Sequence, residues 1–146
     1  MERNKVPSIW WVWLVVASVL TMLYSLSFVL LPDISLSSTS DVYLGSPDAY
    51  QAFGDDGAAY LRFILGVSGA ISVAWMTLIL LVVLVPFRRG ERWAWQAVTA
   101  SILIWFLFDS GHSIASGFSA NAIYNLLILI LFAIPLGASY RCFQRR

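Results

Sequence analysis

The sequence predicts an all-α integral membrane protein, an antiparallel bundle of four helices that forms a single domain over residues 1–146. Composition is the first reason: 60% of the residues are hydrophobic and 12% are charged, whereas soluble domains average roughly 25% charged residues. Patterning is the second, because the apolar residues gather in four runs of about the 20 residues that a bilayer-spanning helix needs. With too few charges to cover a soluble surface, the helices are expected to lie in lipid.

Each predicted span ends at a recognisable signal. The four spans cover residues 8–31, 58–85, 93–117 and 120–140. Pro32 closes the first and Pro86 the second, while Gly117 suits a helix C-terminus and Pro135 bends the last turns of the fourth. A cleaved signal peptide is the alternative for the first span. It is disfavoured because signal h-regions run only about 7–15 residues.

Positive charge marks one side of the predicted bundle. The cations that flank the spans are Arg3, Lys5, Arg88, Arg89, Arg92, Arg141, Arg145 and Arg146. The connection 32–57 contains aspartates but no lysine or arginine. The positive-inside rule therefore places both termini in the cytoplasm. The tryptophans at positions 10, 11, 13, 93 and 95 would form an aromatic belt at the same interface.

The connection 32–57 is predicted to be an outer loop that carries a short interfacial helix near 47–53. Ser46 suits an N-cap, Pro47 suits the first helical position and Gly54 suits the end. This helix either lies on the outer leaflet or forms a lid over a cavity.

Three ionisable residues fall inside the predicted spans, namely Arg62, Asp109 and His112. Such residues are costly in lipid and are functional candidates by default. At 1.5 Å per residue, Asp109 lies roughly 24 Å from the inner end of its span, in the outer third of the hydrocarbon. Tyr24 and Asn125 reach a similar depth on other spans. We expect these five residues to line one outward-facing polar pocket that binds a ligand.

Pairing is expected within this pocket, because Asp109 is too deep to reach water with its short side chain. Arg62 is the only span cation of fixed charge, so an Arg62–Asp109 ion pair is predicted, either as a structural clasp or as part of a ligand site. A side chain of Arg62 that snorkels to the headgroups and a packing role for His112 are the alternatives. Gly66 and Gly69 share the face of Arg62 and would permit close helix approach.

Several kinds of site are excluded or disfavoured. A lone His with a lone Asp does not make a zinc site, and no catalytic motif, cofactor loop or nucleic-acid surface is recognisable. Cys142 is the only cysteine, which excludes an intrachain disulfide. It is expected to be a free cytoplasmic thiol, with palmitoylation as the alternative.

The turn between the second and third spans reads Arg-x-Gly-Glu-x-Trp-Ala-Trp over residues 88–95, and an acidic residue, Asp109, follows late in the third span. In this the chain resembles a group of uncharacterised bacterial four-span membrane proteins, over about residues 60–136. The resemblance implies the bacterial inner membrane and implies no activity.

The favoured function is a binding or accessory protein with the outward-facing pocket as its site. A proton-coupled small-molecule transporter, working as a homo-oligomer through Asp109 and His112, is the alternative. A membrane-embedded enzyme comes third, because no nucleophile is activated by a recognisable arrangement. The expected partners are membrane lipids, a small-molecule or lipid ligand, and a second copy or another membrane protein.

Overall fold

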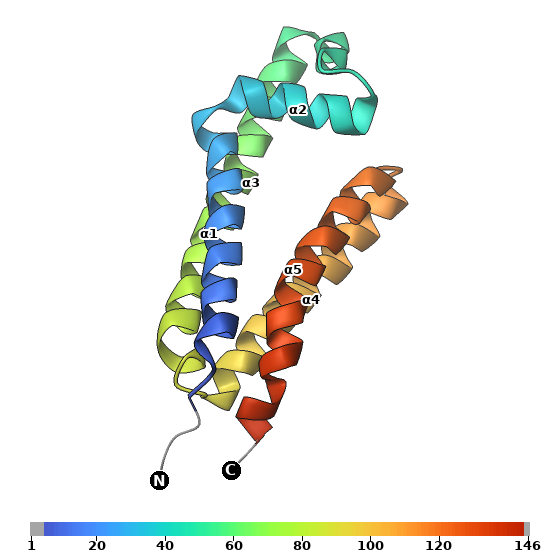
Figure 1. Ribbon diagram of the computed structural model, residues 1–146. Coiled ribbons are helices and arrows are strands. Elements are labelled where there is room, and N and C mark those ends of the chain that lie inside the picture. Colours follow the sequence, from blue (N-terminus) through green and yellow to red (C-terminus); the bar gives the residue numbers. More distant parts are fainter. Residues whose placement is uncertain (1–4, 145–146) are drawn as a thin grey trace. The chain divides into compact units, whose positions relative to one another are not determined.

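The computed structural model describes residues 5–144, which form helices and no strands. Along the chain these are α1 (Ser8–Leu30), α2 (Pro32–Leu44), the 3-10 helix η1 (Ala49–Phe53), α3 (Gly54–Val82), the π-helical turn η2 (Val83–Phe87), α4 (Arg92–Ala115) and α5 (Ser119–Gln144) (Figure 1). The topology prediction also uses Arg3, Arg145 and Arg146, which lie outside the described range.

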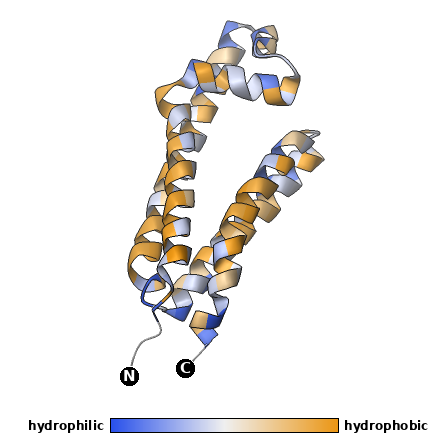
Figure 2. Cartoon of the chain, viewed as in Figure 1, coloured by the Kyte–Doolittle hydropathy of each residue, from blue (hydrophilic) through white to orange (hydrophobic). Residues whose placement is uncertain are grey.

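Four helical segments are long and apolar enough to cross a membrane: α1, the continuous stretch Ala49–Phe87, α4 and α5. Only 22–28% of the residues in their apolar windows are buried. Many of the others are exposed apolar side chains such as Phe108, which is 77% exposed. Figure 2 shows these apolar residues along the lengths of the helices, with hydrophilic residues gathered at their ends. Apolar surface of this extent is stable in lipid and not in water, so the prediction of a small multi-pass membrane protein is confirmed.

The turns between spans follow the sequence closely, with one difference. Gly90 and Gly117 have positive φ angles of 75° and 86°, a conformation that favours glycine and lets the chain reverse after α3 and α4. Pro86, however, does not close the second span at Val85. Proline has no backbone N–H to donate, and the helix widens into η2, in which the Arg88 N–H donates to the Val83 carbonyl at 3.2 Å.

The connection between the first two spans is largely helical. The helix η1 lies inside the predicted 47–53 region, and α2 occupies a stretch that the prediction left as loop. Pro32 stands in the first turn of α2, where a backbone N–H would have no partner within the helix. The negative charge of Asp33 stabilises the positive N-terminal end of the same helix. The buried Ser40 hydroxyl accepts from the Tyr50 N–H at 3.1 Å and donates to the Ser46 carbonyl at 2.9 Å, which joins α2 to η1.

The described chain divides into two compact units, residues 5–19 with 78–144, and residues 20–77. In the first unit α4 and α5 pack along each other as a hairpin. Phe87 and Phe132 are fully buried there, and the Phe87 and Phe143 rings lie 4.9 Å apart. The beginning of α1 joins this unit, because the Trp13 indole donates to the Leu131 carbonyl at 3.0 Å.

In the second unit, the second half of α1 approaches α3 closely at Gly69. A Cβ atom at this position would lie 2.5 Å from the Ser25 carbonyl oxygen and 2.9 Å from the Cβ of Phe28. The close approach predicted for Gly69 is therefore confirmed. At Gly66 the nearest atom, the Phe28 carbonyl oxygen, would be 3.9 Å away, which is ordinary contact. Close packing thus depends on one glycine of the pair.

Candidate functional site

Asp109 and Asn125 meet between α4 and α5. The Asn125 side-chain amide donates to Oδ2 of Asp109 at 2.8 Å and to the hydroxyl of Ser110 at 3.2 Å. One turn nearer the hairpin end, the Asn121 amide donates to the Ser113 hydroxyl at 2.7 Å. These five residues form a continuous line of polar contacts between the two helices, hereafter the polar seam.

The hairpin turn explains why these residues face one another. Asp109 and Asn125 lie eight residues before and eight residues after Gly117, and Ser113 and Asn121 lie four residues before and after it. Residues four apart share a helix face. Two antiparallel helices joined at Gly117 therefore bring the pairs to matching heights.

The Asp109 carboxylate is only partly satisfied. Oδ2 accepts from Asn125, and among residues 5–144 Oδ1 has no hydrogen-bond or ion-pair partner. Asp109 is half-buried, whereas Asn125 is 4% exposed. The buried amide therefore holds the carboxylate in place, and a free oxygen remains at the edge of the seam. An ionised carboxylate accepts up to four hydrogen bonds, so Oδ1 can receive a proton, a cation or a donor from another molecule.

His112 lies one helical turn beyond Asp109, in the last turn of α4. Its side chain is exposed and, within the described part of the chain, makes no hydrogen bond or ion pair. His112 is thus close to the seam in sequence without being part of its hydrogen-bond network.

Arg62 pairs with Asp33. The predicted pair with Asp109 would join two different units and stays a prediction. Its Nε lies 2.7 Å from Oδ1 of Asp33, the second residue of α2. The side chains of Arg62 and Asp33 are 36% and 74% exposed, and exposed pairs of this kind contribute about 0–1 kcal/mol. The prediction missed this acid because it assigned Asp33 to a loop. Arg62 therefore finds its counter-charge in α2, outside the apolar part of α3.

Tyr24, the remaining predicted site residue, lies on α1 with 60% of its surface exposed, and its ring contacts Phe28 edge-on at 4.9 Å. Tyr24 and Arg62 belong to the unit 20–77, whereas Asp109, His112 and Asn125 belong to the other unit. That all five line one pocket stays a prediction.

Two contacts of the candidate site residues were not predicted from the sequence. Ser110 was overlooked because it follows Asp109 directly and so falls off the stripe of residues spaced by three or four. Its contact with Asn125 could have been found from their nearly equal separation from Gly117. For Asp33 no comparable signal exists in the sequence.

Among residues 5–144, no cluster of three or more His, Cys, Asp or Glu side chains could hold a metal ion. No protein-family model, no curated protein and no solved structure matches the chain. The geometry of the polar seam is therefore what supports a function.

Proposed function

We propose that the chain is a multi-pass protein of the bacterial inner membrane, with both termini in the cytoplasm, that works as a binding or accessory protein through Asp109. The resemblance of its inner turn supports the bacterial membrane. The basic residues at the connected ends of α3 and α4 and at the end of α5 support the orientation. One observation carries the binding role: the embedded carboxylate of Asp109 keeps one oxygen unpaired.

An unpaired carboxylate oxygen is costly in hydrocarbon, where water cannot reach it easily. Asn125 offsets part of this cost through one charge-assisted hydrogen bond. The rest is offset when a donor or a cation reaches Oδ1. Asp109 is itself partly exposed, and the two residues before it, Leu107 and Phe108, are 65% and 77% exposed, as expected for a lipid-facing part of α4. The ligand class that fits is an amphiphile with a protonated amine, which reaches Asp109 from within the bilayer.

Dodecylamine, a single-chain amphiphilic amine, tests this role. Its equilibrium binding would be measured in nanodiscs of zwitterionic lipid with the wild-type chain and with Asp109→Asn, which keeps the shape and removes the charge. Hydrogen bonds to charged groups are worth about 1.5–3 kcal/mol, so we expect binding to weaken by at least about tenfold. The matched control is Asp55→Asn, which removes an equal charge from an exposed position in the first turn of α3.

A second measurement reads the carboxyl directly. Dicyclohexylcarbodiimide is apolar and forms covalent adducts with carboxyls in membranes, so peptide mass spectrometry should find the adduct on Asp109, and dodecylamine should slow its formation. Equal dodecylamine affinity for wild type and Asp109→Asn would refute the binding role. So would labelling of Asp109 that dodecylamine leaves unchanged.

A further inference from the structure

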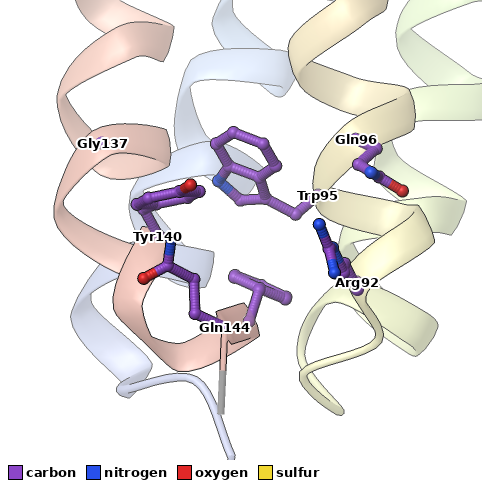
Figure 3. A pocket seen from close by; sticks show the side chains of 7 residues that line it. Arg92, Trp95, Gln96, Gly137, Tyr140 and Gln144 are labelled. Atoms are coloured by element: carbon purple, nitrogen blue, oxygen red, sulfur yellow. The ribbon is translucent and has the colours of Figure 1, made fainter. Parts of the chain in front are cut away.

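A cavity of about 510 Å³ opens between α4 and α5 at the basic end of the hairpin (Figure 3). Asp109 lies near the other end of α4. Sites for small molecules occupy roughly 300–1,000 Å³, so its size suits a ligand. Seven residues of the described range line the cavity: Arg92, Trp95, Gln96, Gly137, Tyr140, Phe143 and Gln144. The first three come from α4 and the others from α5.

Fixed aromatic rings build the apolar wall of this cavity. The Trp95 indole donates to the Leu136 carbonyl at 2.9 Å, which holds it between the two helices. The rings of Tyr140 and Phe143 lie 5.0 Å and 6.4 Å from the Trp95 ring. In Figure 3 the Tyr140 ring and the Trp95 ring border the same space. The wall is thus formed before any ligand enters, which lowers the entropic cost of binding.

The cavity is also lined by hydrogen-bond donors that have no partner within the described part of the chain. Within residues 5–144, Arg92, Gln96 and Gln144 make no ion pair and no side-chain hydrogen bond. Of the residues that the structure describes, no acidic one lines the cavity. The nearest acid in sequence, Glu91, accepts from the Trp93 indole at 2.8 Å. Arg92 is also the first residue of α4, where the helix dipole adds positive potential. The cavity therefore combines a cation and amide donors with an aromatic surface.

We propose that this cavity binds the headgroup of an anionic phospholipid from the adjacent leaflet. The phosphodiester would accept from the guanidinium of Arg92 and from the amides of Gln96 and Gln144, a recognition mode that suits arginine. The glycerol and the first acyl carbons would lie on Trp95 and Tyr140, since amphipathic rings sit at the headgroup level. A soluble phosphate would leave this aromatic wall unused. The site is independent of the role proposed for Asp109.

The charge of Arg92 provides the first test. Binding of phosphatidylglycerol to the full chain would be measured by native mass spectrometry from detergent, with phosphatidylcholine as the reference lipid. A basic residue near an anionic surface is worth about 1 kcal/mol, so Arg92→Gln should weaken phosphatidylglycerol binding by about fivefold and leave phosphatidylcholine unchanged. Arg89→Gln removes an equal charge three residues away, outside the cavity, and should have less effect. Equal weakening by both variants would show a diffuse surface attraction and overturn the site.

A steric block tests the cavity without changing charge. A Cβ at Gly137 meets no atom within 4 Å, and Gly137 lines the cavity. Gly137→Leu should therefore fold and fill the space, weakening phosphatidylglycerol binding by at least fivefold, in line with the loss from Arg92→Gln. Gly111→Leu is the matched control, because Gly111 is a helical glycine of α4 with equally open surroundings. Unchanged binding in Gly137→Leu, or displacement of the lipid by inorganic phosphate, would overturn the proposal.

Discussion

Removing Asn125 should destabilise the protein more than removing the charged residue that it holds. The Asn125 amide makes two hydrogen bonds, at 2.8 Å to Asp109 and at 3.2 Å to Ser110. Hydrogen bonds between membrane helices average about 0.6 kcal/mol, with a maximum near 1.7 kcal/mol. With the upper value for the carboxylate and the average for Ser110, Asn125→Ala should cost about 2 kcal/mol.

Asp109→Ala should cost less. It removes one hydrogen bond and leaves Asn125 the bond to Ser110, and it also removes a charge that lipid disfavours. The loss expected is about 1 kcal/mol or below, by the same range of hydrogen-bond strengths. The free energy of unfolding of the double variant should fall by about 2 kcal/mol in total, because this variant has no carboxylate that could remain without a hydrogen-bond partner. The coupling free energy between the two positions is therefore about 1 kcal/mol.

The assay is equilibrium unfolding of the purified chain by sodium dodecyl sulfate in mild detergent micelles, followed by circular dichroism and tryptophan fluorescence. Asn121→Ala serves as the comparison, because the bond that it removes to Ser113, at 2.7 Å, joins two neutral groups and is worth about 0.6 kcal/mol. Losses that add in the double variant would show that Asp109 and Asn125 do not interact. A larger loss for Asp109→Ala than for Asn125→Ala would refute the reasoning on charge.

Two further predictions test the topology and the helix packing. Single cysteines would be placed at Ser46 and at Arg89 in a Cys142→Ser background. An impermeant thiol reagent should label the first from outside the cell and the second only after permeabilisation. Equal labelling of the two positions would contradict the orientation. Gly69→Ala should lower the free energy of unfolding by about 1–3 kcal/mol through overpacking against α1, whereas Gly66→Ala should gain up to about 1 kcal/mol of helix propensity. Equal effects of the two alanines on detergent unfolding would refute the close approach at Gly69.

The spans and the polar seam could be predicted because each depends on nearby sequence. A helix that spans a bilayer needs a long apolar run, so the positions of such runs in the sequence locate the four spanning segments. The seam follows from a short hairpin, since Asp109 and Asn125 stand equally far from Gly117. In both cases the geometry is set by a short stretch of continuous chain, because a helix rises by roughly 1.5 Å per residue and so fixes the height of each side chain.

The helix α2 could not be predicted in the same way. Its sequence is rich in serine, which competes with the helix backbone for hydrogen bonds and so reads as loop. Contacts outside the helix hold it: the Ser35 hydroxyl donates to the Ser27 carbonyl of α1 at 3.0 Å, and Ser40 joins it to η1. The ion pair of Arg62 with Asp33 depends on this placement. The pairing of Arg62 with Asp33 was thus missed together with the helix that carries Asp33.

Trp13 makes a hydrogen bond to a residue far away in the sequence, and the chemistry of proline explains this bond. The sequence placed Trp13 in an interfacial belt and Pro135 at a bend, as two unrelated features. Proline cannot donate to the carbonyl four residues before it, so Pro135 leaves the Leu131 carbonyl without a helical partner, and lipid offers no water to replace it. The Trp13 indole supplies the missing donor at 3.0 Å, from 118 residues away in the chain. Pro135 therefore leaves a free carbonyl on α5 to which the beginning of α1 binds. One hydrogen bond then satisfies both the indole N–H of Trp13 and the carbonyl of Leu131.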